Sequence, residues 1–481
     1  MANGGIIGTV NIPTSTTATG VWQQEEQYEA KVTDTWPQRA LFTTKSARFN
    51  DGSSDYLNKT ASAGNRRTFT FSTWLKLSQL TTARNLFTSW SANNDAGFTY
   101  LAITDGDKIK FSGYGTTYLE TTQLLRDSSS WYHLMLAVDT TSGTANNRCR
   151  IYLNGSEITS FGTRNNPSQN ADLAYNQNSV DLVLGSNNYG GSKGNYFDGY
   201  LAEFIAVDGQ QLAPTSFGVA NSDGVWTPIP YTGTFGTNGF NLQFENSAAL
   251  GTDSSPNGNT YTVNNLTSID QSTDYPEVNF ATFNPLYKSD SVYSEGNLKN
   301  VFVAADHFGG VSTIGVATGK WYAEFKTLVS SGQDVGVGIT GNPQLASNTN
   351  QGVGEEDNSI GYRSDGNKGI EDTFSSYGAS YTTNDIIGVA LDLTSGTKTI
   401  EFFKNGASQG AITISLTPAD GVWFLSANSL AAGTADWEAN FGSPPFAISS
   451  SNADGNGYGN FEYAVPSGYY ALNTANLAEF G

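Results

Sequence analysis

Short stretches that alternate between hydrophobic and polar residues cover most of the chain, and Gly, Asn, Asp and Ser residues separate them. Phe69 and Phe71 alternate with Thr and Ser residues, and residues 321–325 show the same period of two. In residues 131–138 both alternating sets are largely apolar, as in a strand that is covered on both faces. This pattern predicts an all-β protein built from antiparallel β-sandwiches.

Changes in the pattern divide the chain into four segments. Residues 1–39 combine a Gly- and Thr-rich start with one short predicted helix. Residues 40–218 form a first predicted sandwich, and residues 219–285 form a β-containing connector rich in Pro, Gly and Asn. Residues 286–481 form a second predicted sandwich with a C-terminal extension.

The predicted helix lies near the N-terminus and has a narrow apolar stripe. Val21, Tyr28 and Val32 are spaced seven and four residues apart, which places them on one helical face. Because this stripe is too small to fold alone, we expect Trp22 and Trp36 to dock onto another surface together with Tyr28. Packing of the same segment against the chain's own next domain is the alternative.

The charge balance narrows the range of partners. The 481 residues include 24 Lys and Arg and 44 Asp and Glu, which gives a net charge of −20. Nucleic acids and anionic membranes attract basic surfaces, so neither is an expected partner. No apolar stretch approaches the ~18 residues of a membrane span, and the N-terminus lacks the pattern of a signal peptide. Membrane insertion and classical secretion are therefore not expected.

Few side chains could support catalysis, and each has a structural interpretation. Cys149 shares a strand face with apolar neighbours and is predicted to be a buried thiol. His133 lies in an apolar strand and is predicted to be packed, whereas His307 lies in a predicted solvated loop. Residues 406–410 match the Gly-x-Ser-x-Gly nucleophile elbow, but they lie between two predicted strands and are interpreted as a hairpin loop. The acidic residues 355–357 are interpreted as a solvated turn or a cation contact, so no enzymatic activity is predicted.

Metal binding receives little support from the sequence. No Cys/His cluster with zinc-ligand spacing occurs. Residues 452–457 have the oxygen spacing of the first half of a calcium loop, but Tyr463 stands where such a loop ends in glutamate. We therefore predict no metal and no cofactor, with calcium at this loop as the alternative.

The first predicted sandwich resembles the laminin-G-like, concanavalin A-like jelly rolls. The matching pieces follow one another in the order and spacing of that family, over residues 47–56, 69–74, 131–133, 151–155, 184–185 and 196–204. The resemblance implies a two-sheet sandwich that is often used for carbohydrate or protein binding and occasionally for glycan hydrolysis.

The second predicted sandwich resembles SPRY domains. Six pieces match in the right order, over residues 319–325, 335–338, 360–366, 384–392, 400–406 and 440–446. The resemblance implies a binding sandwich without catalytic activity, whose loops contact a partner.

The flanking segments resemble structural proteins of marine tailed bacteriophages, in which an attachment region precedes lectin-like and SPRY-like modules. The carriers are residues 4–8, the pair Val21-Trp22, residues 279–286 and residues 466–474. This resemblance implies a virion protein and is the only feature of the sequence that points to a virus.

Exposed aromatic rings and polar side chains in turns are typical of sugar-binding sites. Candidate glycan-binding residues in the first sandwich are Trp90, Asn94, Tyr114, Tyr118, Tyr189 and Tyr196. Those in the second are Tyr362, Arg363, Asp365 and Tyr377. The alternative is that these side chains cover core edges or subunit contacts.

Together these features favour a non-enzymatic virion protein. We interpret it as a tail fibre or receptor-binding appendage that carries lectin-like modules to host surface polysaccharide. Residues 1–39 would contact other virion proteins, and a homo-oligomer such as a trimer would gain avidity from weak sites. The alternatives are a capsid decoration or structural fibre that makes only protein contacts, and a glycan hydrolase with carboxylates from distant strands.

Overall fold

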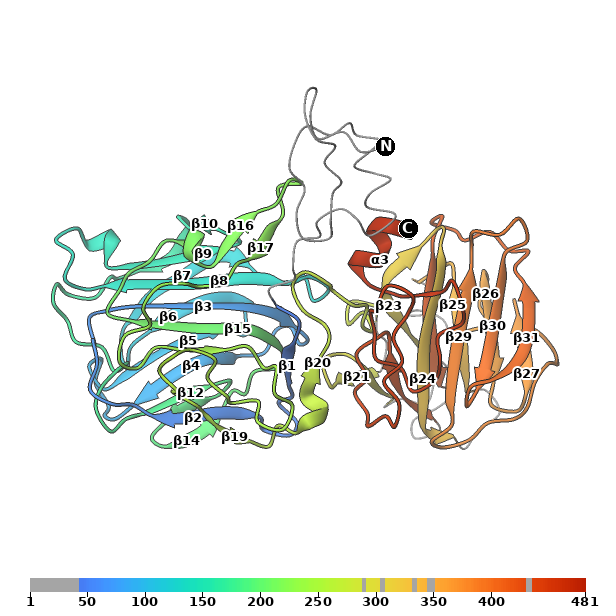
Figure 1. The fold of residues 1–481 in the computed structure, drawn as a ribbon, viewed down its shortest axis with the longest axis horizontal. Helices are drawn as coiled ribbons and strands as arrows, with labels where there is room; N and C mark the ends of the chain where they lie inside the picture. Colours follow the sequence, from blue (N-terminus) through green and yellow to red (C-terminus); the bar gives the residue numbers. More distant parts are fainter. Residues whose placement is uncertain (1–42, 288–290, 303–307, 331–334, 344–350, 430–434) are drawn as a thin grey trace, which may run out of the picture. The chain divides into compact units, whose positions relative to one another are not determined.

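The computed structural model of the protein describes residues 43–287, 291–302, 308–330, 335–343, 351–429 and 435–481. Thr43–Gly481 is one compact unit that contains two antiparallel β-sandwiches (Figure 1). The predicted all-β fold class is thereby confirmed. The helix predicted within residues 19–32 lies outside the described residues.

The first sandwich consists of two eight-stranded sheets. One sheet has the order β10 (Ser156–Glu157), β9 (Cys149–Leu153), β8 (Tyr132–Asp139), β3 (Thr68–Leu77), β15 (Gly199–Asp208), β1 (Ser46–Phe49) and β20 (Gln271–Ser272), with β18 (Phe240–Leu242) also paired to β15. The other has the order β11 (Phe161–Arg164), β7 (Thr117–Leu124), β6 (Lys108–Ser112), β5 (Phe98–Ile103), β4 (Arg84–Trp90), β12 (Asp181–Leu184), β2 (Tyr56–Thr60) and β19 (Thr262–Asn264).

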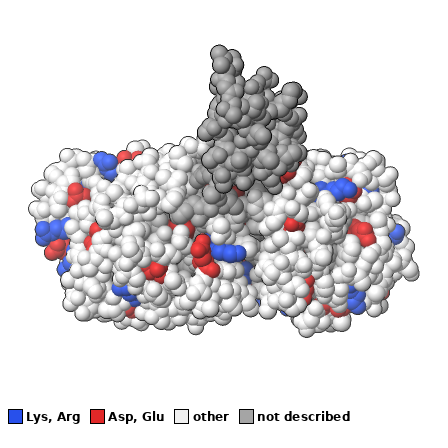
Figure 2. Space-filling view, viewed as in Figure 1, with Lys and Arg blue, Asp and Glu red and all other residues white. Residues whose placement is uncertain are grey.

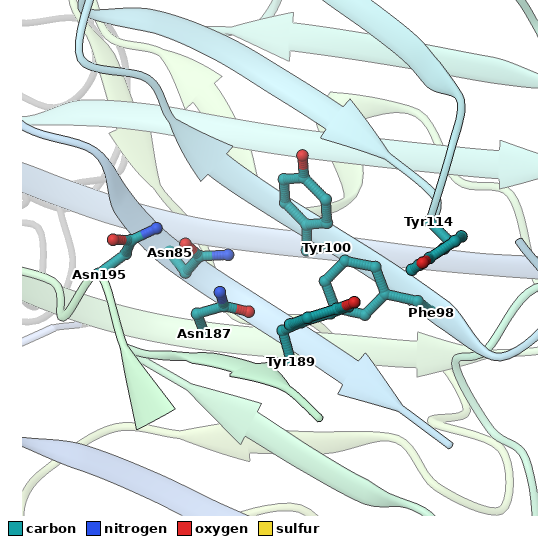
Figure 3. A pocket seen from close by; sticks show the side chains of 7 residues that line it. All are labelled: Asn85, Phe98, Tyr100, Tyr114, Asn187, Tyr189 and Asn195. Atoms are coloured by element: carbon teal, nitrogen blue, oxygen red, sulfur yellow. The ribbon is translucent and has the colours of Figure 1, made fainter. Parts of the chain in front are cut away.

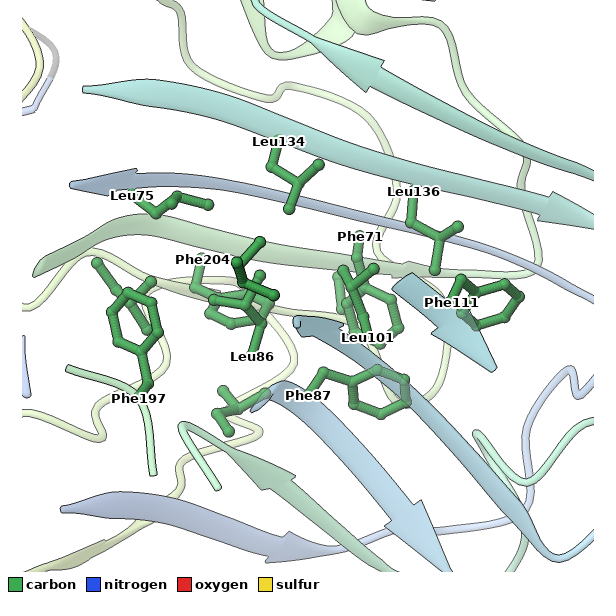
Figure 4. Packing of buried hydrophobic residues seen from close by; sticks show 14 of the residues in the cluster. Phe71, Leu75, Leu86, Phe87, Leu101, Phe111, Leu134, Leu136, Phe197 and Phe204 are labelled. Atoms are coloured by element: carbon green, nitrogen blue, oxygen red, sulfur yellow. The ribbon is translucent and has the colours of Figure 1, made fainter. Parts of the chain in front are cut away.

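Apolar side chains from the facing sides of these two sheets form one core (Figure 4). The ring of Phe71 in β3 lies 4.4 Å from that of Phe87 in β4, centroid to centroid. Cys149 is buried in the same core, as predicted, and its burial raises the pKa of the thiol. A buried, protonated thiol of this kind is a packing residue and a poor nucleophile.

The segment predicted as a connector is built into the first sandwich. Its strands β18, β20 and β19 pair with β15, β1 and β2, and so extend both sheets. Phe240 and Leu242 are fully buried, which shows that this segment completes the core. Two short hairpins and three 3-10 turns complete the first half: β13 (Asn187–Tyr189) with β14 (Ser192–Gly194), β16 (Gly218–Ala220) with β17 (Trp226–Pro228), η1 (Ala145–Asn147), η2 (Pro214–Ser216) and η3 (Ser268–Asp270).

The second sandwich also has two sheets. The larger has the order β21 (Ser291–Ser294), β22 (Lys299–Phe302), β33 (Ala435–Asn440), β24 (Lys320–Ser330), β29 (Ile386–Asp392), β30 (Thr399–Lys404) and β31 (Ala407–Thr413), with β34 (Tyr470–Ala471) parallel to β24. The smaller has the order β23 (Phe308–Val316), β32 (Trp423–Ser429), β25 (Gly336–Thr340), β26 (Ser359–Arg363), β27 (Asn367–Ile370) and β28 (Thr373–Ser376). Its core contains the buried indoles of Trp321, Trp423 and Trp437.

Residues 406–410 lie in the β30–β31 hairpin, which confirms their interpretation as part of a hairpin. The chain ends in a short helix, α3 (Thr474–Phe480), that the sequence analysis did not predict. The side chain of Asn473 caps it by accepting a hydrogen bond from the Asn476 amide at 2.9 Å. Among the described residues, no helix has the length and apolar character needed to span a bilayer.

Candidate functional site

Alternation along β4 and β5 places aromatic rings on the outward face of the second sheet of the first sandwich. Leu101 of β5 is buried in the sandwich core, so Phe98 and Tyr100 point to the opposite face. The strand register pairs Phe98 with Trp90 of β4, which faces outward beside it. This face therefore presents a row of rings.

The β13–β14 hairpin brings further side chains to this face. Gly190 and Gly191 form its turn with φ of 64° and 82°, a backbone conformation that favours glycine. Lys193 holds the hairpin, because its Nζ donates to Asn188 Oδ1 at 2.6 Å and lies 3.7 Å from an Asp181 carboxylate oxygen of β12. This arrangement places Tyr189 beside the rings of β5.

These elements enclose a pocket of about 380 Å³ (Figure 3). Its lining residues are Asn85, Phe98, Tyr100, Tyr114, Asn187, Tyr189 and Asn195. The three amide side chains gather toward one end, and the rings of Phe98, Tyr114 and Tyr189 lie at the other. The pocket thus combines apolar faces with neutral hydrogen-bonding groups.

Two tyrosines form the exposed wall of the pocket. The rings of Tyr114 and Tyr189 are stacked, with centroids 6.1 Å apart and planes 16° apart. They are 44% and 43% exposed, and the neighbouring Tyr114 hydroxyl raises the pKa of Tyr189. Asp95 fixes the turn that carries Tyr114, since its carboxylate accepts from the Gly115 amide at 3.0 Å and the Thr116 hydroxyl at 2.7 Å. Large rings are therefore held in a fixed position while open to solvent.

The amides leave hydrogen-bonding capacity unused. The side-chain oxygen of Asn187 is buried and accepts no hydrogen bond, although it lines the pocket. Asn85 donates to Thr88 Oγ1 at 3.2 Å. None of the described residues that line the pocket carries a charge. This chemistry suits a neutral, hydroxyl-rich ligand.

The structure brings together two candidate glycan-binding residues that lie far apart in the sequence. Tyr114 and Tyr189 meet in the pocket, and Trp90 lies on the same face beside Phe98 with its indole N–H donating to Asn93 Oδ1 at 3.2 Å. Asn94 is exposed in the turn that follows β4.

Like Trp90 and Asn94, the remaining candidates Tyr118 and Tyr196 are not among the described residues that line the pocket. The interpretation of Tyr118 as a glycan-binding residue is corrected by the structure. Tyr118 is buried in the core against Phe111, with 5.4 Å between the ring centroids. Tyr196 is half-buried and packs on Tyr56 at 6.4 Å.

The sequence analysis missed Phe98, Tyr100, Asn85 and Asn195. The first two share one strand face, and this period of two was an available signal for an outward aromatic pair. The two amides come from distant positions that only the folded chain brings together.

Three of the four candidates of the second sandwich pack against other side chains of the protein. Tyr362 is fully buried and its hydroxyl donates to the Ala379 carbonyl, which corrects its interpretation as a ligand contact. Arg363 is also buried; its guanidinium lies 3.4 Å from a Glu355 carboxylate oxygen and 4.3 Å from the Phe374 ring centroid. Tyr377 is half-buried and packs edge-on against Tyr362.

Asp365 is the exposed member of that set. Its carboxylate accepts hydrogen bonds from the Asn367 amide and side chain at 2.9 and 2.8 Å. The attachment candidates Trp22, Tyr28 and Trp36 lie outside the described residues.

The structure confirms that His133 is packed. The Trp226 indole donates to its Nδ1 at 2.9 Å, so its Nε2 carries the proton and donates to the Ser72 hydroxyl at 2.8 Å. Complete burial lowers the pKa of His133 to about 3. The second histidine, His307, lies outside the described residues.

The acidic side chains within residues 355–357 and 452–457 are not all open to solvent. Glu356 is buried, which corrects the interpretation of residues 355–357, and burial raises its pKa to about 8. In residues 452–457, the Asp454 carboxylate accepts hydrogen bonds from the Tyr458 and Ala471 amides, both at 2.9 Å. Within the described ranges, no three His, Cys, Asp or Glu side chains are grouped so that they could hold a metal ion.

The comparison with protein families supports the two resemblances seen in the sequence. Residues 51–210 match the concanavalin A-like lectin/glucanases superfamily (Laminin_G_3), and residues 320–424 match the SPRY domain. The chain thus carries a concanavalin A-like domain and a SPRY domain, which are typically binding modules. No curated protein matches the chain.

Several solved structures show similar folds. A human SPRY domain is 15% identical, and the match covers 33% of this chain and 97% of that one (TM-score 0.27). A candidate carbohydrate-binding protein from Bacteroides ovatus is 17% identical, with 48% and 60% covered (TM-score 0.33). A SAP-like pentraxin from Limulus polyphemus is 15% identical, with 33% and 71% covered (TM-score 0.26). These scores are too low for the similarities to carry an argument about this chain.

Proposed function

We propose that the protein is a non-enzymatic binding protein whose first sandwich binds neutral glycans in the pocket formed by Tyr114, Tyr189 and their neighbours. The single observation that carries this proposal is the pair of stacked, exposed rings beside uncharged amides. The concanavalin A-like domain match is consistent with such a site.

The chemistry of the pocket explains the choice of ligand. The C–H face of a pyranose ring packs well on a tyrosine ring, and burying an exposed ring stabilises the complex. Amides such as Asn187 can donate to and accept from sugar hydroxyls. The described lining residues include no Lys or Arg that would attract a carboxylated or sulfated sugar, and the net charge of −20 opposes binding of polyanions.

The charge distribution agrees with this interpretation. On the face shown in Figure 2, the charged side chains of the described residues are scattered as separate spots, and no basic patch is visible. A phosphate backbone or an acidic polysaccharide would require such a patch. As far as the structure describes the lining, it also contains no carboxylate, and these residues therefore provide no acid–base pair for glycoside hydrolysis.

A glycan array with neutral and acidic members tests the proposal on the full chain. We expect retention of neutral glycans and a loss of more than about tenfold in signal for Tyr189→Ala, because the variant removes one stacking face. Since Tyr189 is exposed, the substitution should leave the fold intact.

Phe374→Ala is the matched control. Phe374 is an exposed ring of the second sandwich, and its removal should leave the array signal unchanged. Equal loss in both variants, or binding of acidic glycans alone, would contradict the proposed site.

We also propose that the protein is a component of a virion, where it forms a tail fibre or receptor-binding appendage attached through residues 1–39. The resemblance of the flanking segments to phage structural proteins supports this location. An antibody against residues 286–481 is expected to label the tail tip or fibres of intact particles. Label spread over the head would favour capsid decoration, and unlabelled particles would contradict a virion location.

A further inference from the structure

A lysine and an asparagine that are far apart in the sequence meet in a buried site at β3. Lys76 is 1% exposed, and its Nζ donates to Asn279 Oδ1 at 2.7 Å. The two residues are separated by 203 positions along the chain. Because a C=O bond is about 1.2 Å long, this hydrogen bond places Nζ roughly 3–4 Å from the side-chain amide carbon of Asn279. This is the range of distances from which an amine attacks a carbonyl carbon.

The carboxylate of Asp274 lies beside the same amine. Asp274 is buried, and its Oδ2 accepts a hydrogen bond from Lys76 Nζ at 2.8 Å. The Trp131 indole donates to Oδ1 at 2.9 Å, which holds the carboxylate in place. Burial penalises an ammonium and a carboxylate that are both charged. Transfer of one proton from Nζ to Oδ2 removes both charges and leaves the lysine as a neutral amine, which is the nucleophilic form.

The asparagine amide is held in one orientation relative to this amine. Asn279 Nδ2 donates to the Ser129 carbonyl at 2.6 Å, so that Oδ1 faces the lysine. The Phe280 carbonyl accepts a further hydrogen bond from Lys76 Nζ at 2.9 Å, and the ring centroid of Tyr200 lies 5.6 Å from Nζ. The amine and the amide are therefore aligned before any reaction, which lowers the entropic cost of joining them.

We propose that Lys76 and Asn279 form an intramolecular isopeptide bond, with Asp274 as the proton carrier. Lys76 Nζ attacks Asn279 Cγ, a bond between these two atoms forms, and the bond from Cγ to Nδ2 breaks. The lysine ammonium gives up two protons in all. Both move to the departing nitrogen, with Asp274 as their carrier, and Nδ2 leaves as ammonium. Asp274 ends as the carboxylate that it was at the start, and the step consumes no other reactant.

The bond fastens β3 to a segment that also packs on the second sandwich. Phe280, which follows Asn279, belongs to a buried cluster with Tyr322 of β24. A covalent link between residues 203 positions apart restricts the unfolded chain and so stabilises the folded one. The bond involves none of the residues that line the glycan pocket, and it stands independently of the proposed function.

The intact mass of the full chain tests the proposal. Loss of ammonia should make the wild type about 17 Da lighter than its sequence mass. A trypsin digest should contain the peptides of Lys76 and Asn279 joined as one species, which distinguishes this bond from loss of ammonia within a single asparagine. Asn279→Ala and Asp274→Asn should show the full sequence mass. Asn264→Ala, which changes a half-buried amide elsewhere, should keep the loss.

Denaturing gel electrophoresis provides a second readout. The internally joined wild type should migrate differently from Asn279→Ala, with and without a reducing agent. An intrachain disulfide cannot cause this difference, because the chain has one cysteine. A folded wild type with the full sequence mass and two separate peptides would overturn the proposal. A joined species formed to the wild-type extent in Asp274→Asn would overturn the role of Asp274.

Discussion

Replacing Lys76 by alanine is expected to lower the free energy of unfolding by about 3–5 kcal/mol, because the substitution leaves a buried carboxylate unpaired. Lys76 of β3 is almost fully buried, and its Nζ donates to Asp274 Oδ2 at 2.8 Å, to Asn279 Oδ1 at 2.7 Å and to the Phe280 carbonyl at 2.9 Å. Trp131 donates to the other oxygen of Asp274 at 2.9 Å. This network ties the first sandwich to the segment that leads into the second.

Chemical denaturation followed by circular dichroism measures this effect. Lys108→Ala is the matched control, because Lys108 is part-exposed and lies 3.7 Å from Glu120 in a surface ion pair. That variant should change stability by less than about 1 kcal/mol. If Lys76→Ala behaved like Lys108→Ala, the buried network would not contribute as the contacts indicate.

Stability is expected to fall as the pH rises from about 5.5 to about 8.5. Burial raises the pKa of Glu203 to about 8, of Glu324 to about 7 and of Glu356 to about 8, from an ordinary value of 4.5. Each is bound to a proton more tightly in the folded chain. The stability that each protonated glutamate contributes is complete below about pH 4.5, and it is lost as the pH rises through the folded-state pKa of that glutamate. For Glu356 alone, the loss between about pH 5.5 and about pH 8.5 is roughly 3–4 kcal/mol.

Melting temperatures across this pH range measure the effect, and Glu356→Gln isolates one glutamate. Glutamine is uncharged at every pH, so the variant should lose less stability than the wild type at alkaline pH. Glu157→Gln changes an exposed glutamate and should leave the pH profile unaltered. A wild-type profile that is flat or rises with pH would contradict the burial of neutral glutamates. On the acid side, the pKa of His133 is lowered to about 3, so this residue destabilises the fold as the pH falls below about 6.5.

The sheet architecture was readable from the sequence because burial imposes a period of two. The burial of Phe71, Cys149 and His133 could be predicted for the same reason. The strand that carries each side chain determines which face of the sheet it lies on, and the neighbouring residues of that strand show this in the sequence. The cap at Asn473 is a local signal of α3 that was available but not used.

The pocket was harder to predict because it depends on contacts between distant segments. Tyr114 and Tyr118 are only four residues apart, yet Tyr114 is exposed and Tyr118 is buried. The pairing of β6 with β7 shifts register near these residues. Tyr362 lies in β26, where every residue is buried, so a polar and aromatic sequence was mistaken for an exposed loop. Asn85, Asn187 and Asn195 meet only because the β13–β14 hairpin packs near β4.

Isothermal titration of the best glycan from the array is the most direct test of the glycan site. The full chain, Tyr189→Ala and the control Phe374→Ala should be titrated under the same conditions. We predict binding by the full chain and by Phe374→Ala, with affinity reduced at least about tenfold in Tyr189→Ala. Equal affinity in all three proteins would contradict binding at the stacked tyrosines.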